Sequence, residues 1–259
     1  MRQTVRVLFG SALWLFIGTL LGLPVIGRSA SEVPEQETTQ KLETKATQTD
    51  QSSTELIYKP PKRGMPDGRV AGGTRGGEQR ALPMILAVAP EHVGLTGEDQ
   101  PTLYWYLSTL TQLPVRFILA ANQTEQALVD TRLALPPRAG IQVIRLADYG
   151  VTLKPGLVYR WQITVGPDPK HRSGQVFAGG TIEQQAYPDI LSEKIKKSGK
   201  PRLPILFAEE GYWYDAIAAI SVLIDGAPTD RDLRMQRASL FTQVGLTKLA
   251  DAELRGEGQ

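Results

Sequence analysis

VTLKPGLVYRWQITV, residues 151–165, gives the clearest indication of how this chain folds. Pro155 and Gly156 predict a turn, and Tyr159 opens the alternating run that follows it. A tyrosine in this position turns its ring inward while its hydroxyl bonds back to the preceding loop, the arrangement called a tyrosine corner. Every second residue from Tyr159 shares one face of the strand, which puts Trp161 on the same face. The stretch therefore predicts a core strand of an antiparallel β-sandwich, and it names no substrate.

Further short apolar runs recur around this strand at the spacing of a sandwich. Together they predict strands at residues 82–88, 102–107, 115–120, 127–134, 141–146, 157–165 and 175–182, separated by Pro and Gly turn signals. In the second of these, Leu103, Trp105 and Leu107 share one face. We expect Trp105 and Trp161 to be core neighbours on opposing sheets. Seven strands and a tyrosine corner favour an immunoglobulin-like sandwich over a barrel.

The hydrophobic period changes after Glu183. Residues 187–197 predict a short helix, and residues 204–226 begin a helical pair that Gly226 interrupts. Thr229 is the expected cap of the next helix. Residues 208–216 resemble the first helix of a tetratricopeptide repeat, present here once, and a single repeat cannot bury its own face. The expected fold class is therefore α+β: an immunoglobulin-like antiparallel β-sandwich of about seven strands, then a tetratricopeptide-like helix pair.

The N-terminal part of the 259-residue chain predicts a cellular location rather than a fold. Arg2 and Arg6 precede an apolar run at residues 7–27, which indicates a signal peptide or an uncleaved membrane anchor in residues 1–30. Residues 31–61 are polar and predict a disordered linker. We expect the sandwich domain at residues 62–185 and the helical region at residues 186–259. The body would be exported, to the periplasm or beyond, and membrane-anchored if residues 7–27 are retained.

Composition excludes several kinds of site. The net charge of +2 gives no argument for nucleic acid, and the absence of cysteine excludes disulfides, thiolate nucleophiles and cysteine metal sites. Residues 61–77 are rich in glycine, but they lack the lysine of a phosphate-binding loop. We expect an irregular segment there, with Arg75 held against the sheet or an acidic partner.

Three stretches together resemble a cyanobacterial family known only as domain-of-unknown-function family 928. They are RVAGGTRG at residues 69–76, YRW at residues 159–161 and GYWYDA at residues 211–216, and the match would cover roughly residues 63–254. The resemblance implies exported proteins with a β-rich body and a helical tail, and it supplies no activity. The family commonly has cysteines where this chain has Gly77 and Gly166, so the resemblance implies a bridge that this chain lacks.

The aromatic cluster Tyr212, Trp213 and Tyr214 with Asp215 is the first candidate for a binding site. Trp213 would be the anchor against the apolar or sugar face of a partner, and this needs Trp213 or Tyr104 to be partly exposed. The alternative interpretation is that Trp213 and Tyr214 fasten the helical tail to the sandwich, while Asp215 makes a hydrogen bond or salt bridge.

Other candidates for chemistry are few. Glu209, Glu210 and Asp215 could serve glycoside hydrolysis if two carboxyl groups face each other across a cleft. The two histidines, His92 and His171, fall in expected loops without a visible partner. A mildly basic rim forms where Arg160, Lys170 and Arg172 approach one end of the sandwich, and such rims are usually solvated loop ends.

These observations predict an exported accessory protein of the cell envelope that binds an unknown envelope protein or a polysaccharide without catalysis. We expect no catalytic residues, no metal, no cofactor and no nucleic-acid partner. The alternatives are an envelope glycan hydrolase and a purely structural spacer domain. The residues expected to bind are Trp213, Tyr212, Tyr214, Asp215 and Arg75, and those expected to be structural are Tyr159, Trp161, Trp105, Pro155 and Gly156.

Overall fold

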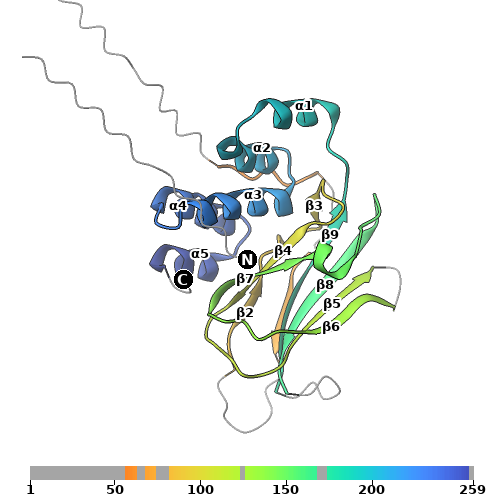
Figure 1. The fold of residues 1–259 in the computed structure, drawn as a ribbon, viewed down its shortest axis with the longest axis vertical. Coiled ribbons are helices and arrows are strands. Elements are labelled where there is room, and N and C mark those ends of the chain that lie inside the picture. The colour runs from red at the N-terminus through yellow and green to blue at the C-terminus, as the bar shows by residue number, and fades with distance from the viewer. Residues whose placement is uncertain (1–55, 63–67, 74–81, 123–125, 168–173, 257–259) are drawn as a thin grey trace, which may run out of the picture. The chain divides into compact units, whose positions relative to one another are not determined.

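A computed structural model describes residues 56–62, 68–73, 82–122, 126–167 and 174–256 of the chain (Figure 1). The strands are β1 Val70–Gly73, β2 Ile85–Ala87, β3 Gly94–Thr96, β4 Thr102–Leu107, β5 Val115–Ala121, β6 Ala127–Leu133, β7 Gly140–Arg145, β8 Val158–Val165 and β9 Val176–Gln184. The helices are α1 Asp189–Lys197, α2 Leu203–Glu209, α3 Trp213–Gly226, α4 Arg231–Gln243 and α5 Thr247–Arg255, with short 3-10 turns at Leu146–Tyr149 and Lys200–Arg202. The described body is thus α+β, with strands followed by helices, as the sequence predicts.

Two sheets make up the β-rich part. The larger has the order β1-β9-β8-β5-β6, with β3 added beside β9, and the smaller has the order β2-β4-β7. All strand pairs are antiparallel except β3 with β9, which is parallel. Because β1 and β3 pair with opposite ends of the long strand β9, they share one of its edges.

All seven strands expected from the hydrophobic pattern are present, most within one or two residues of the expected bounds. The first is shorter than expected, because only Ile85–Ala87 pairs with β4. The strands β1 and β3 were not predicted from the sequence. Both are short and contain glycine, and each has its pairing partner about a hundred residues away in β9, so no local pattern marks them.

The strand β8 is built as its sequence predicts. Its residues alternate between the interior and the outer face, and Tyr159, Trp161, Ile163 and Val165 are buried. The backbone N–H of Lys154 donates a hydrogen bond to the Tyr159 hydroxyl at 2.9 Å, which confirms the tyrosine corner. Gly156 occupies the turn with a φ of 73°, a conformation that favours glycine.

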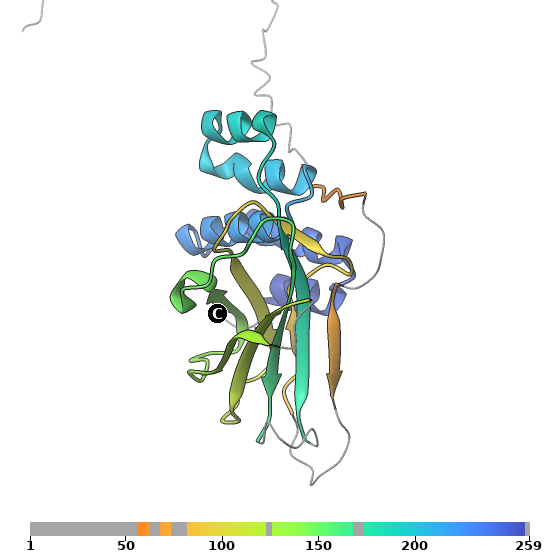
Figure 2. The same ribbon diagram turned by 90° about the vertical axis from the view of Figure 1, so that its right-hand side faces the viewer.

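Trp105 and Trp161 lie in the core, on β4 of the smaller sheet and β8 of the larger. Both faces of β4 are covered, because Tyr104, on the face opposite Trp105, lies against Ser221 of α3. The helix α3 contacts both β3 and β4. In Figure 1 and Figure 2 the helices gather towards one end of the strands.

The helical region differs from the expectation in three details. Gly211, with a φ of 82°, separates α2 from α3, so the stretch expected as one helix is two. The cap of α4 is Asp230 rather than Thr229, because the Asp230 carboxylate accepts from the N–H groups of Asp232 and Leu233. Gly245, with a φ of 75°, then ends that helix and lets α5 form separately.

The expected linker is wrong at its C-terminal end. Leu56 and Tyr58 are buried, at 2% and 6% exposure, and Gln243 of α4 bonds to the backbone of both. Lys59 also donates its N–H to the carbonyl of Ala208 in α2. We call residues 56–61 the N-terminal strap. The strap packs because it buries its two large apolar side chains. A polar average over residues 31–61 conceals these two residues.

The rest of the expected signal and linker lies outside the described residues. Within the described part of the chain, no helix has the length and apolar character needed to cross a membrane.

Candidate functional site

The predicted aromatic anchor is wrong, because its residues are buried. Tyr212, Trp213 and Tyr214 are 2%, 0% and 1% exposed, and Tyr104 is 7% exposed. The Trp213 indole donates to the carbonyl of Val88 at 3.0 Å. These side chains therefore cannot meet a partner in the folded protein.

The alternative interpretation of this cluster is confirmed. The Tyr214 hydroxyl accepts from the Trp161 indole of β8 at 2.9 Å and donates to the carbonyl of Thr181 in β9 at 2.9 Å. Tyr214 thus fastens α3 to two neighbouring strands of the larger sheet. A Cβ at Gly180 would lie 3.2 Å from this hydroxyl and 2.5 Å from the Ala89 side chain, which explains the glycine there.

Asp215 joins α3 to the loop after β3 and is 5% exposed. One carboxylate oxygen accepts from the Thr96 hydroxyl at 2.6 Å, and the other accepts from the Gly97 N–H at 2.7 Å and the Tyr187 hydroxyl at 2.9 Å. Burial raises the pKa of Asp215 to about 7, although these three donors act in the opposite direction. The carboxylate is held by the protein itself and is not presented to a ligand.

The two-carboxylate arrangement that a glycoside hydrolase needs is not formed by Glu209, Glu210 and Asp215. Asp215 points into the joint just described, whereas Glu210 is exposed and pairs with Lys194 at 3.4 Å. Glu209 is half-buried. A pair facing each other across a cleft is therefore absent from this cluster in the described structure.

Of the two histidines, the structure describes His92. The His92 Nε2 lies 2.9 Å from the hydroxyl of Tyr58, and burial lowers the pKa of His92. His171, Lys170, Arg172 and Arg75 lie outside the described residues. Among the residues that the structure does describe, no three His, Asp or Glu side chains are grouped so as to hold a metal ion.

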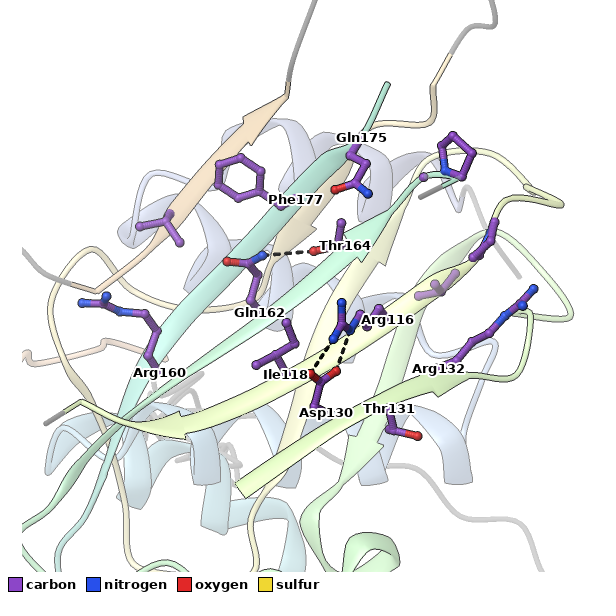
Figure 3. A pocket seen from close by; sticks show the side chains of 15 residues that line it. Arg116, Ile118, Asp130, Thr131, Arg132, Arg160, Gln162, Thr164, Gln175 and Phe177 are labelled. Atoms are coloured by element: carbon purple, nitrogen blue, oxygen red, sulfur yellow. Dashed lines mark hydrogen bonds and ion pairs between the residues drawn. The ribbon is translucent and has the colours of Figure 1, made fainter. Parts of the chain in front are cut away.

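The described structure instead presents a hollow of about 900 Å³ on the outer face of the larger sheet (Figure 3). We call it the sheet-face hollow. Its polar lining comes from Arg116 of β5, Asp130, Thr131 and Arg132 of β6, and Arg160, Gln162 and Thr164 of β8, with Gln175 beside β9; its apolar lining includes Ile118, Phe177 and Val70.

Strand alternation explains why these side chains meet. On β8 the buried Tyr159, Trp161 and Ile163 face the core, so Arg160, Gln162 and Thr164 face the opposite side. Cross-strand pairing places Arg116 between Thr164 and Arg132, and Ile118 between Gln162 and Asp130. Because Trp161 bonds to α3, the hollow lies on the face of the sheet turned away from that helix.

The charges in the hollow are unequal. Its described lining contains three arginines and a single carboxylate, that of Asp130. Arg116 binds this carboxylate with two N–H groups, and the hydrogen bond to Asp130 raises the pKa of Arg116 further. Figure 3 shows Arg132 and Arg160 on opposite sides of this central pair. The hollow therefore favours a polar ligand that carries negative charge.

The apolar part of the hollow depends on a glycine. A Cβ at Gly72 of β1 would lie 2.4 Å from the ring of Phe177, its cross-strand neighbour on β9. The half-buried ring therefore lies over the backbone of β1, which only a residue without a side chain permits.

One member of this site, Arg160, was predicted from the sequence, as part of a basic rim. The others were missed. The signal available was the polar residues at every second position from Arg160 to Thr164, together with Arg116 in residues 115–120. Such positions mark an outer face, but they do not say which outer faces become neighbours.

The comparisons with known proteins give no indication of an activity. No curated protein matches the chain. An engineered protein of known crystal structure matches with 12% identity and a TM-score of 0.28, over 40% of this chain and 20% of its own. A multi-domain immunophilin from Arabidopsis thaliana matches with 7% identity and a TM-score of 0.16, over 64% of this chain and 98% of its own. This chain thus spans about a fifth of the engineered protein's length, and neither likeness supports an argument about fold or function.

A family model, by contrast, matches most of the described body. The match runs over residues 70–254, from β1 to the end of α5, and includes the tyrosine corner, the buried aromatic cluster and the hollow. Over these residues the chain belongs to the family described as Domain of Unknown Function (DUF928).

Proposed function

We propose that this protein is an exported, non-catalytic binding protein of the cell envelope, and that the sheet-face hollow holds a polysaccharide. The observation that carries the proposal is the composition of the hollow: arginine, glutamine and threonine side chains around a half-buried aromatic ring, on an outer sheet face.

The side chains of the hollow match the chemistry of sugars. The amides of Gln162 and Gln175 and the hydroxyl of Thr164 can each donate and accept hydrogen bonds, as sugar hydroxyls do. Gln162 already donates to Thr164 at 3.0 Å, which fixes both side chains in place. The ring of Phe177 offers an apolar surface against which the C–H face of a sugar can pack.

Binding fits the hollow better than hydrolysis does. Glycoside hydrolysis uses two carboxyl groups, about 5–10 Å apart, of which one keeps a proton. Among the described residues that line the hollow, Asp130 is the single carboxylate, and Arg116 holds both of its oxygens.

The proposal that the protein is exported rests on its sequence. The arginines at positions 2 and 6 and the apolar run at residues 7–27 support a secretory signal or an anchor, and an envelope location places the hollow among polysaccharides. The two sheets with their tyrosine corner support classing the β-rich part as immunoglobulin-like. The α3–α4 pair with Gly211 at its start supports a tetratricopeptide-like unit.

The proposal is tested by titrating isotope-labelled protein with soluble neutral and acidic polysaccharides and following backbone amide NMR shifts. We expect shifts to cluster at Gln162, Thr164 and Phe177 and to be absent from α3, α4 and α5. Replacing both Gln162 and Phe177 with Ala lowers the affinity about tenfold, because hydrogen bonds and apolar contact are lost together.

The matched control is Val222→Ala, which shortens a side chain that is 59% exposed on α3 and leaves binding unchanged. Shifts centred on the helices, or no shifts with any polysaccharide, would disprove the site. New reducing ends released from a bound polysaccharide would favour the hydrolase alternative instead.

A further inference from the structure

The arginines of the hollow are spread across three strands, and the distance between them determines how long a ligand must be to contact more than one. Arg132 of β6 and Thr164 of β8 flank Arg116 of β5 in one cross-strand row. Arg160 lies four residues before Thr164 on β8. With strands about 4.8 Å apart and about 3.3 Å per residue, the Cα atoms of Arg132 and Arg160 are about 16 Å apart on a diagonal.

Figure 3 shows the guanidinium groups of Arg132 and Arg160 pointing away from each other, so a single small anion does not contact both ends of this diagonal. A phosphate or acetate ion would reach Arg132 or Arg160, and the centre between them is already neutralised by the pairing of Arg116 with Asp130. Arg160 has an interaction within the protein, yet it is exposed, and a guanidinium has five donors to share. An extended ligand with separated negative charges fits this arrangement.

The same spacing argues against nucleic acid. Each strand of a duplex carries one phosphate per about 3.4 Å of axis, and proteins that bind single strands add several aromatic rings for stacking. The described lining offers arginines at the two ends and one ring, Phe177. Between the ends lies Ile118, with Gln162 beside it, and these two side chains suit neutral sugars rather than further phosphates.

We propose that the sheet-face hollow binds an extended acidic polysaccharide, lying diagonally from Arg132 to Arg160, whose acidic groups meet these arginines while the sugars between them pass over Ile118, with Gln162 beside them. This inference rests on the proposed function and adds the charge, the direction and the minimum length of the ligand. The Arg116–Asp130 pair holds the middle of the path neutral.

The test is a calorimetric titration of the full chain with galacturonic acid oligomers of increasing length, and with the fully methyl-esterified oligomers of the same lengths. Affinity for the acidic series rises with length until a chain spans both arginines and then levels off. Arg132→Gln and Arg160→Gln each weaken binding of a long acidic oligomer about tenfold and reduce its salt dependence. The esterified series binds weakly, and neither variant changes that.

Asp130→Asn is the variant that separates this inference from a general loss of structure, because it strengthens binding. The change leaves Arg116 without its carboxylate partner, so acidic oligomers bind about threefold more tightly. The matched control, Lys248→Gln, removes an exposed positive charge on α5 and has no effect.

The outcomes separate the inference from the function on which it rests. If esterified oligomers bind as tightly as acidic ones and Arg132→Gln changes neither, the inference is overturned and polysaccharide binding stands. If no oligomer binds, acidic or neutral, both are overturned. A single-stranded oligonucleotide of equal charge that binds as tightly as the acidic oligomer would overturn the class of ligand.

Discussion

Asp215 shows how one residue serves the fold while resembling a functional group. It follows three aromatic residues and carries a charge, which is the composition of many binding sites. In the structure its two oxygens accept three hydrogen bonds, from Thr96, Gly97 and Tyr187, and a Cβ at Gly97 would collide with the ring of Tyr187. The carboxylate therefore holds α3, the loop after β3 and the segment after β9 together.

We predict that Asp215 makes stability depend on pH. Its pKa is raised from 3.8 to about 7, so between these values the folded protein keeps a proton that the unfolded chain has released. The contribution of Asp215 to the free energy of unfolding therefore falls as the pH rises through this window, by up to about 4 kcal/mol, and is constant above it. Urea denaturation of the parent protein and of Asp215→Asn from pH 4 to pH 8 measures this contribution. We expect the difference between their free energies of unfolding to change with pH up to about pH 7 and to be constant above it.

The control for this titration is Asp189→Asn, which replaces an exposed carboxylate and keeps the pH dependence of the parent. An Asp215→Asn protein whose stability follows the same pH dependence as the parent would contradict the assignment.

At the scale of elements, the helical region is joined by one buried ion pair. Arg237 of α4 donates to both carboxylate oxygens of Glu253 on α5, at 2.7 and 2.9 Å, and to the hydroxyl of Ser221 on α3 at 3.0 Å. The two charged side chains are only 10% and 7% exposed. Three helices thus meet at a single guanidinium, whose planar set of donors fixes their relative positions.

We predict that Arg237→Ala lowers the free energy of unfolding by about 3–5 kcal/mol, because it leaves the Glu253 carboxylate buried without a partner. The double change Arg237→Met with Glu253→Leu costs less, since no charge is then buried. Lys196→Ala, which breaks an exposed pair with Glu193 on α1, costs less than about 1 kcal/mol. Chemical denaturation measures all three, and a double variant less stable than Arg237→Ala would refute the explanation.

At the scale of the whole molecule, the N-terminal strap ties the start of the described chain to helices near its end. The ring of Tyr58 packs edge-on against Trp213, with 5.0 Å between ring centres. Position 211 requires glycine because of the strap as well as its φ, since a Cβ there would lie 2.9 Å from the carbonyl oxygen of Lys59. The buried aromatic cluster is therefore closed by residues about 150 positions away in the sequence.

We predict that a protein beginning at residue 62 is less stable than one beginning at residue 56, by about 3–6 kcal/mol. The difference is the burial of Leu56 and Tyr58, each worth about 1.5–3 kcal/mol. Thermal and urea denaturation of the two truncated proteins measure it directly. Equal stabilities would mean that the strap contributes nothing and that the linker extends to residue 61 after all.

Much of the fold could be predicted because its signals are local. The turn at Pro155-Gly156, the inward Tyr159 and the alternation after it depend on neighbours within a few residues, and the strand bounds followed from the same periodicity. The short strands β1 and β3 could not be predicted, because their identity depends on β9, far away in the sequence.

The succession of a β-rich part and a helical part, the tyrosine corner and the absence of cysteine chemistry follow from the sequence alone. Which aromatic and charged side chains are available to a ligand depends on the tertiary structure. Tryptophan and arginine are both common in binding sites, but Tyr58 of the strap and the chain after β2 cover Trp213, and the edge position of β6 exposes Arg132. The physical reason is that exposure depends on what lies opposite a side chain, and in a sheet that neighbour comes from a distant part of the chain.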